Sequence, residues 1–412
     1  MLTRISILNF KGISRITLPL APLTIFIGEN GTGKSTVLQT LSMLKRSANQ
    51  MQVFTDLPYA NLGQLSNLIP PAKVSEIEIS GWEMISLPAI PTDKVSFTHR
   101  VGFDVNGLFS NTTELKIGEQ IVLNDWTRAF QSIEPRDWKI RKAHFNLSPQ
   151  PNIGVAFNLG GYSFEGSPTP DETKSSQETY NDLTKLASLI SSILQRIFIV
   201  SPQRGLTDPF YGLQPSPTEE YSPRQGTQVM GSSLATNLEY NRLNIAQISD
   251  WEREILGVGV STKLQPGPVI YVKNPERGTD FVNEGFGSNQ LLFVLERIAN
   301  TPDYSIVGIE EPEIHLHPKA QFNFGKWLAK TLPFLRKQVI ITTHSSDIIA
   351  GILAGVHQKT IKPEYVSLLF FEQKDKKIEA SISEIDQDGK VTGPALRSFV
   401  ESAAAQLSEY TR

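Results

Sequence analysis

Apolar residues alternate with polar ones near the N-terminus and then close up into a short apolar run. The alternation includes Ile5 and Ile7 and returns between Ile16 and Leu20, and residues 23–27 read LTIFI. A period of two is typical of a strand with one buried face, whereas a short apolar run is typical of a strand buried on both faces. The pattern therefore predicts a β-hairpin that leads into a central strand.

A glycine-rich loop and a helix follow this predicted strand. Residues 28–36 read GENGTGKST, and the apolar residues of segment 37–44 recur at helical spacing. The loop fits GxxxxGK[ST], in which backbone N–H groups close around phosphate oxygens and glycine leaves them room. In this interpretation Lys34 reaches the β- and γ-phosphates of ATP and Ser35 ligates Mg²⁺. The predicted nucleotide-binding residues of this loop are Gly28, Asn30, Gly31, Gly33, Lys34, Ser35 and Thr36.

The middle of the chain has a different pattern. Segments 75–79, 95–101 and 153–159 alternate between apolar and polar residues and are separated by Pro and Gly, which predicts a mainly β region. No heptad repeat is present, so we expect no long coiled coil. The features predicted next are exposed loops at 167–179 and 214–228, a helix at 183–194 and a strand at 197–200.

Beyond residue 280 the predicted helices and strands alternate, which indicates an α/β arrangement. In chain order we expect a glycine-rich loop and helix at 281–299, a strand at 305–309, a helix at 319–332, a strand at 338–342, strands at 365–371 and 377–385, and a helix at 394–410.

Composition and charge narrow the class of protein. The 412 residues are 39% hydrophobic and 20% charged, which suits a globular chain of two to three domains, or of one core with a large insertion. A net charge of -3 leaves nucleic-acid contact to a local basic patch. Cysteine is absent, which excludes disulfides and thiolate sites. With neither a signal-peptide pattern nor a membrane-spanning apolar stretch, we expect a cytoplasmic protein without membrane contact.

Two glutamates and one histidine follow predicted strands at positions that suit nucleotide chemistry. Glu310 and Glu311 end the strand at 305–309, at the carboxyl edge where parallel sheets bind ligands. We expect Glu310 to hold the Mg²⁺ shell and Glu311 to polarise an attacking water. His344 follows the strand at 338–342 and can donate a hydrogen bond to a γ-phosphate. Taken alone, two acids after a strand are more often part of a solvated loop, and the histidine is more simply satisfied by nearby hydroxyls. The phosphate loop decides for function.

Other polar groups are interpreted as structural. His315 and His317 lack the further ligands of a metal site, and Asp386 and Asp388 in EIDQDGK are typical of a turn between strands. The basic segment 136–144 includes Trp138 and fits either a phosphate-backbone contact or, more often, a solvated face.

The phosphate loop, EEPEIHLHP and TTHSSDI stand in one order along the chain, and this order resembles the ABC-type ATPase domains of the SMC, RecF and OLD proteins. LNFKGI at 8–13 is also similar to the opening of that group. The resemblance covers about residues 1–45 and 280–355. It implies an α/β P-loop NTPase core of the ABC-type head at 1–50 and 280–412. A large, mainly β and mixed insertion at 51–279, β-rich to about residue 165, then separates the Walker A loop from the signature motif.

The resemblance also implies further site residues. NEGFGSNQLL is similar to the signature loop, which in that family completes the ATP site of a second subunit. It assigns this role to Gly285, Gly287 and Ser288, with Asn289 and Gln290 beside them, and Ser288 is expected to cap a helix that begins near Asn289. IFIVSPQRG offers Gln203 as the Q-loop glutamine, and Arg204 beside it fits a phosphate contact or a surface salt bridge.

The function implied by the resemblance is Mg²⁺-dependent hydrolysis of ATP by a homodimer or higher oligomer. In this reading hydrolysis is coupled to DNA or to a separate effector such as a nuclease, in prokaryotic antiviral defence or DNA maintenance. A nucleotide-gated scaffold with slow hydrolysis and a RecF-like repair ATPase are the alternatives. OLD nucleases carry a C-terminal Toprim domain, whereas 68 residues follow His344, so we expect no nuclease site in this chain.

Overall fold

The computed structural model describes residues 1–47, 53–86, 94–107, 109–117, 120–128, 142–145, 154–158, 161–165, 185–186, 188–217, 221–375 and 377–393. Its central element is a mixed sheet in the order β11-β15-β16-β3-β17-β18-β19. The first five of these strands are parallel and the last two are antiparallel to their neighbours. The bounds are β11 Ile197–Val200, β15 Ile306–Glu310, β16 Gln338–Thr343, β3 Leu23–Gly28, β17 Val366–Lys374, β18 Lys377–Ile385 and β19 Val391–Thr392.

Both faces of this sheet are buried, which explains the apolar run predicted as a central strand. In β3, Ile25 and Ile27 pack into one hydrophobic cluster and Phe26 into the other. A strand with period-two side chains needs apolar residues at every position when layers cover both faces.

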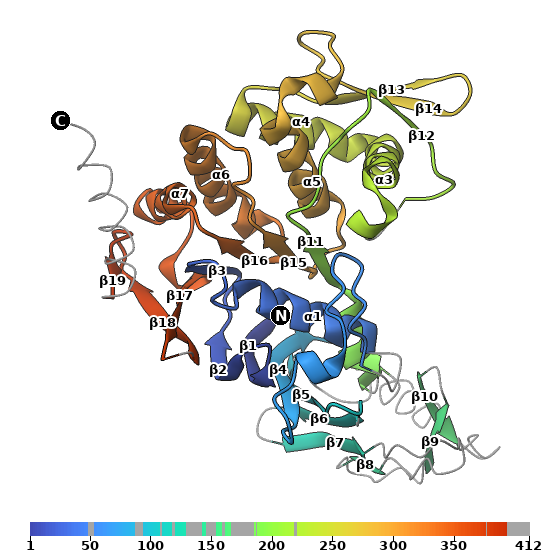
Figure 1. The fold of residues 1–412 in the computed structure, drawn as a ribbon, viewed down its shortest axis with the longest axis vertical. Helices are drawn as coiled ribbons and strands as arrows, with labels where there is room; N and C mark the ends of the chain where they lie inside the picture. Colours follow the sequence, from blue (N-terminus) through green and yellow to red (C-terminus); the bar gives the residue numbers. More distant parts are fainter. Residues whose placement is uncertain are drawn as a thin grey trace.

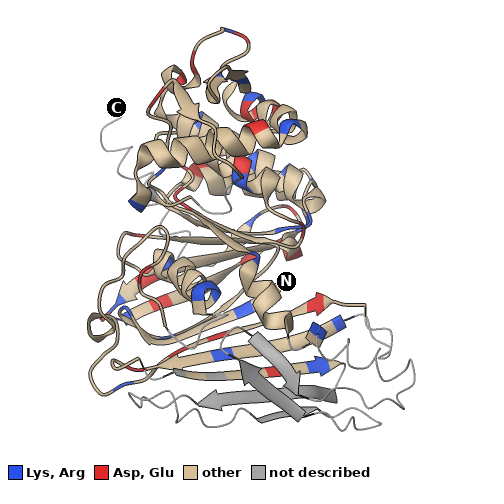
Figure 2. Cartoon of the chain, turned by 90° about the vertical axis from the view of Figure 1, so that its right-hand side faces the viewer, with Lys and Arg blue, Asp and Glu red and all other residues tan. Residues whose placement is uncertain are grey.

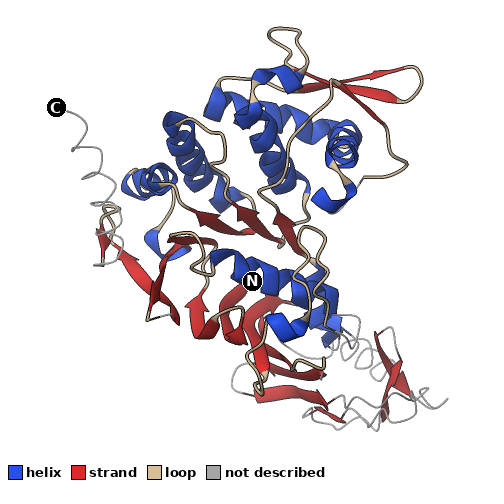
Figure 3. Cartoon of the chain, in the orientation of Figure 1, coloured by secondary structure: helices blue, strands red, loops and turns tan. Residues whose placement is uncertain are grey.

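One face of the sheet carries a layer of helices (Figures 1 and 3). Their bounds are α3 Thr227–Tyr240, α4 Arg242–Leu256, α5 Phe286–Asn300, α6 Pro318–Thr331 and α7 Ser346–His357. Trp327 of α6 anchors this layer, since it is 1% exposed and its ring contacts both Trp251 and Phe324. The short helices are η1 Leu65–Asn67, η2 Pro223–Gln225, η3 Phe281–Glu284, η4 Leu332–Phe334 and η5 Pro363–Tyr365.

Helix α1, Lys34–Ser47, lies on the other face, between the mixed sheet and an antiparallel sheet (Figure 1). Its Leu38 and Leu41 share a hydrophobic cluster with Ile5 and Ile77 of the antiparallel sheet and with Phe26 of β3. The antiparallel sheet has the order β2-β1-β4-β5-β6-β7-β8. Its bounds are β1 Leu2–Phe10, β2 Ile13–Pro19, β4 Ser75–Met84, β5 Lys94–Phe103, β6 Phe109–Ile117, β7 Gln120–Arg128 and β8 Lys142–Phe145.

Two smaller sheets complete the described fold. One has the order β12-β14-β13 and lies beside α3 and α4, and the other pairs β9 with β10 (Figure 1). Their bounds are β12 Phe210–Gly212, β13 Ser261–Gln265, β14 Val269–Lys273, β9 Gly154–Asn158 and β10 Gly161–Glu165. No helix within the described ranges is long and apolar enough to cross a bilayer.

Most predicted elements are present. The N-terminal hairpin pairs Ile5 with Leu18, and the α/β order after residue 280 is confirmed strand by strand. The loop predicted at 214–228 is wrong in part, because Tyr221 is 6% exposed and α3 begins at Thr227. The loop at 167–179, the basic residues 136–141 and the helix at 394–410 lie outside the described residues.

The division into a core at 1–50 and 280–412 and an insertion at 51–279 stays a prediction. The sheets, however, cross both of its boundaries. Strand β1 pairs with β4, and β11 joins the mixed sheet beside β15 although residues 197–200 fall within the predicted insertion.

Candidate functional site

The glycine-rich loop connects the carboxyl end of β3 to the first turn of α1. Gly28, Gly31 and Gly33 have positive φ values of 153°, 78° and 90°. A Cβ on Gly28 would lie 2.1 Å from the main-chain oxygen of Phe371 in the neighbouring strand β17, which no side chain can do. Gly28 therefore permits the close approach of β3 to β17 at the start of the loop. The N-terminus of α1, which follows the loop, favours a bound anion such as phosphate.

Lys34 is buried at the base of this loop. Its ammonium donates hydrogen bonds to the main-chain oxygens of Gly28 at 2.8 Å and Glu29 at 2.7 Å. Burial lowers the pKa of Lys34 to about 8, although the carboxylates of Glu311, Glu313 and Glu29 oppose the shift. Lys34 is therefore still mainly cationic at pH 7, and its charge is held where the loop would hold phosphate.

Ser35 and Glu310 meet at the carboxyl end of β15. Burial, together with the charge of Glu311, raises the pKa of Glu310 to about 7, while a hydrogen bond from the Ser35 hydroxyl opposes the shift. The Oε1 atom of Glu310 is buried without a hydrogen-bond partner among the described residues. A hydroxyl beside an unsatisfied buried carboxylate oxygen is the oxygen donor chemistry that Mg²⁺ takes, so the residues fit this ion.

Glu311 leaves the strand in a left-handed conformation, with φ 46°. Its N–H donates to the main-chain oxygen of Thr342 in β16 at 2.9 Å, and its Oε1 lies 3.8 Å from Nε2 of His344. About a third of each side chain is exposed, 34% for Glu311 and 31% for His344. A carboxylate that remains open to solvent here can accept a proton from water.

His344 is held by its main chain. Its main-chain N–H donates to Oε1 of Glu313 at 2.6 Å, which holds the backbone of His344 at the end of β16. Burial and the nearby charge of Lys34 lower the pKa of His344, and the Glu311 carboxylate opposes this shift. The imidazole is therefore neutral at pH 7 and able to donate one hydrogen bond. Sequence reasoning missed the part played by Glu313, whose only signal was its place two residues after the glutamate pair.

The β1–β2 turn brings a second lysine to the site, which sequence reasoning also missed. Lys11 donates to Oε1 of Gln39 on α1 at 2.6 Å, and its charge acts on Glu310. The sequence feature that could have pointed to Lys11 is the LNFKGI motif at 8–13, which contains it.

Gln203 and Arg204 lie after β11, at the same edge of the mixed sheet. Gln203 is exposed, and its N–H donates to the Ser201 hydroxyl at 3.1 Å. The surface salt bridge expected for Arg204 was wrong, because this residue is 7% exposed and bonds to four main-chain oxygens. The alternative, a phosphate contact, stays a prediction.

The signature-like loop begins α5. The helix starts at Phe286, with Gly285 as its N-cap, so the prediction that Ser288 caps a helix starting near Asn289 is wrong. Ser288 instead lies in the first turn and is 6% exposed, because Gly285 takes φ 92° and lets the helix start earlier. The Asn289 amide donates to Gly285 at 2.8 Å and ties the loop to the helix.

Gly287 and Phe286 contact the segment that follows the glutamates. A Cβ on Gly287 would lie 2.7 Å from the His315 oxygen, so this glycine permits the close approach. The Phe286 ring is 71% exposed and lies 5.5 Å from the His315 ring.

The remaining polar candidates have structural partners. His317 caps α6 by accepting from the Lys319 N–H, and Asp386 closes the predicted turn by accepting from Asp388 and Lys390 at 2.9 and 2.8 Å. No group of three or more metal-ligating side chains occurs in the part of the chain that the structure describes.

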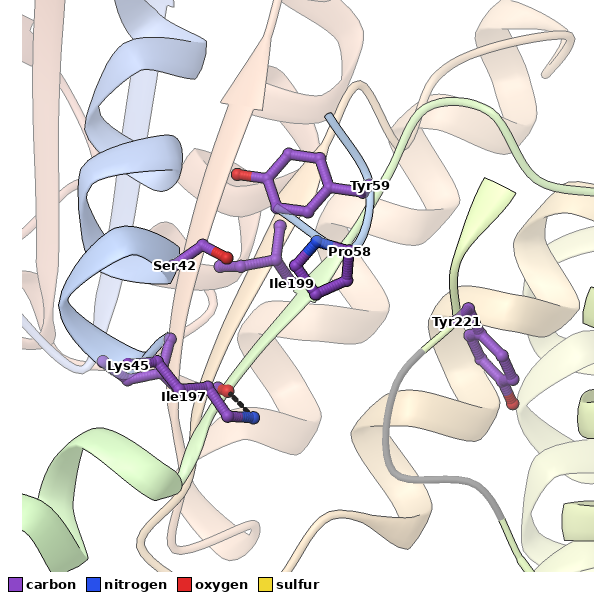
Figure 4. Close-up of a pocket in the computed structure, with 7 residues that line it drawn as sticks. All are labelled: Ser42, Lys45, Pro58, Tyr59, Ile197, Ile199 and Tyr221. Atoms are coloured by element: carbon purple, nitrogen blue, oxygen red, sulfur yellow. Dashed lines mark hydrogen bonds between the residues drawn. The ribbon is translucent and has the colours of Figure 1, made fainter. Parts of the chain in front are cut away.

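A cavity near the C-terminal half of α1 lies apart from these strand ends (Figure 4). Its volume of about 10 Å³ is that of about one water molecule, so it does not suit a nucleotide. Its lining residues are Ser42, Lys45, Pro58, Tyr59, Ile197, Ile199 and Tyr221.

The five parallel strands of the mixed sheet, the phosphate loop after β3 and the acidic residues at the end of β15 define a P-loop nucleotide-binding ATPase domain. The chain matches the model of the family described as AAA ATPase domain over residues 1–142 and 169–349, well over half of its length. It belongs to this AAA ATPase domain family, and the expected ABC-type P-loop fold is confirmed.

The similar proteins include an OLD nuclease and two SMC head structures. The OLD nuclease of Thermus scotoductus is 43% identical over 44 residues, which are 11% of this chain and only 8% of that protein. The SMC head domain from Thermotoga maritima has a TM-score of 0.41 at 12% identity, covering 93% of this chain and 99% of that one. The SMC head bound to the C-winged helix domain of ScpA has a TM-score of 0.46 at 13% identity, covering 94% and 98%.

Proposed function

We propose that this chain binds Mg-ATP at the carboxyl ends of the mixed sheet and hydrolyses it in a dimer of two copies. The observation that supports this most is the Ser35–Glu310 pair, because Oε1 of Glu310 is buried and unsatisfied and Lys34 belongs to the same loop and helix. Bound magnesium would neutralise phosphate charge, and Ser35 and Glu310 would hold it.

In the proposed reaction each residue has one task. Lys34 exchanges its two carbonyl partners, the main-chain oxygens of Gly28 and Glu29, for phosphate oxygens of the bound nucleotide. Glu311 takes a proton from water as the water oxygen bonds to the γ-phosphorus. The bond from the γ-phosphorus to the bridging oxygen then breaks, and ADP leaves with that oxygen. The neutral His344 imidazole donates a hydrogen bond to a γ-phosphate oxygen.

The proposed dimer rests on the exposed start of α5. Gly285 and Phe286 are exposed at a helix N-terminus, where N–H groups favour an anion. We propose that Gly285, Gly287 and Ser288 of one copy face the γ-phosphate held by the other. Gln203 is proposed to contact the water or ion shell from β11. We further propose that hydrolysis is coupled to DNA or to a separate nuclease, in antiviral defence or DNA maintenance. The 44-residue likeness to a protein named OLD nuclease supports only the link to a nuclease.

The test is ATP turnover and solution mass for wild type and Glu311→Gln, with and without Mg-ATP. We expect Glu311→Gln to bind ATP, to lose roughly 100-fold or more in kcat and to accumulate as a dimer, because the proton acceptor is gone and the charge beside the γ-phosphate falls. Glu254→Gln, an exposed glutamate on α4 paired with Lys330, is the control.

If Glu311→Gln hydrolysed ATP as fast as the wild type, Glu311 would not be the group that takes the proton from water. Tight ATP binding with negligible turnover by the wild type would favour the nucleotide-gated scaffold instead.

A further inference from the structure

Arg204 is a buried arginine that bonds to main-chain oxygens from three parts of the site. Nε donates to Gln290 at 3.1 Å, and Nη1 donates to Ser201 at 2.7 Å and to Glu310 at 3.0 Å. Nη2 donates to Glu311 at 3.1 Å. Four of the five N–H groups of the guanidinium are thus used on the chain after β11, on α5 and on the end of β15.

The choice of arginine at this position has a physical reason. Burying a cation is costly unless its donors are satisfied, and only a guanidinium presents five donors in one rigid plane. The charges of Glu313, Glu311 and Glu310 oppose the cost of burying Arg204. Among the described residues its hydrogen bonds nevertheless go to carbonyl oxygens, which leaves the carboxylates available.

The contact with Glu311 bears directly on the conformation of that residue. A φ of 46° is uncommon for a residue other than glycine, so the surrounding structure has to maintain it. The Glu311 peptide is held on both sides, by its N–H bond to Thr342 and by the bond from Arg204 to its oxygen. Without the second bond, the direction of the Glu311 carboxylate is no longer fixed.

The contact with Gln290 ties the same guanidinium to α5. Gln290 lies in the second turn of this helix, whose first turn carries Gly287 and Ser288. Arg204 therefore joins the start of the signature-like helix to the carbonyl groups of both strand-end glutamates.

We propose that Arg204 is a positioning residue that fixes the Glu311 carboxylate and the start of α5 relative to each other. It acts on the rate of hydrolysis and not on the affinity for ATP. This role rests on the proposed function, because it requires Glu311 to take the proton.

The test compares Arg204→Lys with Arg297→Lys. Arg297 is the matched control, since it is 4% exposed and lies on α5, but its guanidinium stacks on the Tyr221 ring at 4.3 Å. We measure kcat and the melting temperature, and we measure the Kd for ATP in the Glu311→Gln background, where turnover does not consume the ligand.

Lysine keeps the charge of Arg204 but cannot reach four carbonyl oxygens. We expect kcat to fall roughly 10- to 100-fold for Arg204→Lys, as for a small misplacement of a reacting group, with Kd changed less than about threefold. The melting temperature should fall no further than in Arg297→Lys.

Three outcomes overturn the proposal. A kcat close to wild type would show that the charge alone suffices, and a Kd that rises as much as kcat falls would indicate general damage to the ATP site. If Arg204→Lys does not fold, Arg204→Met, which keeps the apolar stem, is measured in its place; failure of both to fold makes Arg204 a folding residue only. Absence of turnover in the wild type is a separate result, which overturns the proposed function itself.

Discussion

Glu310 is the residue at which folding and function oppose each other. Its carboxyl is 6% exposed and its Oε1 lacks a partner, so the folded protein favours the protonated form and the pKa rises to about 7. The proposed Mg²⁺, in contrast, would bind the ionised form of Glu310. A buried carboxylate of this kind lowers the stability of the free protein, while its unpartnered oxygen suits a bound cation.

The stability of the free protein should depend on pH through the carboxyl of Glu310. Because the pKa of Glu310 is higher in the folded state than the 4.5 of a free glutamate, the folded state binds this proton more tightly than the unfolded state. The contribution of Glu310 to stability therefore falls as pH rises from about 4.5 through about 7. Glu310→Gln should raise the melting temperature at pH 8 by roughly 3 °C and change it little at pH 5.

Thermal unfolding without nucleotide or Mg²⁺ measures this difference. Mg-ATP should then stabilise the wild type at pH 8 and not the Glu310→Gln variant. If Glu310→Gln changed the melting temperature by the same amount at pH 5 and at pH 8, the burial of an ionisable carboxyl at this position would be contradicted.

At the scale of elements, the loop after β3 depends on its contact with β17. Gly28→Ala places a Cβ 2.1 Å from the Phe371 oxygen, so the strands have to separate, and we expect a loss of roughly 3 kcal/mol or more in the free energy of unfolding. Gly31→Ala is the matched control, since it meets nothing within 4 Å and is strained only by φ 78°, at a cost of about 1 kcal/mol. Urea unfolding compares the two, and equal losses would mean that backbone strain alone matters.

The sequence predicts the elements better than it predicts their neighbours. Alternation and apolar runs are local, so they identify β1, β3, β15 and β16, and the Walker A pattern locates the phosphate loop. The joining of β11 to β15 is set by packing over a long sequence separation. Tyr221 illustrates the same limit, because Pro and Ser around it indicate a loop while its ring packs 5.0 Å from Phe293.

The site is predictable in its residue types and less so in its geometry. Motif spacing identifies Lys34, Glu310, Glu311 and His344 because each directly follows a predicted strand or a glycine-rich loop. No local pattern encodes the four carbonyl contacts of Arg204, since three of its partners come from other segments.

At the scale of the whole molecule, the proposed head-to-tail dimer would make each ATP site from two chains. Lys34→Ala removes the phosphate contact, and Phe286→Arg places a bulky charge at the exposed start of α5 (71% of Phe286 is exposed). Each variant alone should be inactive. Mixed in equal amounts they should regain about a quarter of wild-type turnover, since half the dimers are mixed and each has one intact site.

The matched control mixes Lys34→Ala with Glu311→Gln. These residues belong to the site of one chain, so every site in the mixed dimer lacks one of them and no activity should return. Restoration by both mixtures, or by neither, would contradict the composite site.

The position of β3 in its sheet also affects the order in which the sheet can form during synthesis. Its two neighbours, β16 and β17, begin only at residues 338 and 366. At ribosomal rates the strand that carries the phosphate loop waits roughly 20 to 60 s for either partner. During that time an apolar strand has neither edge covered, which is the condition under which nascent chains aggregate. The nucleotide site is therefore among the last parts of this protein to form, and chaperone supply or translation speed should affect the yield of active protein.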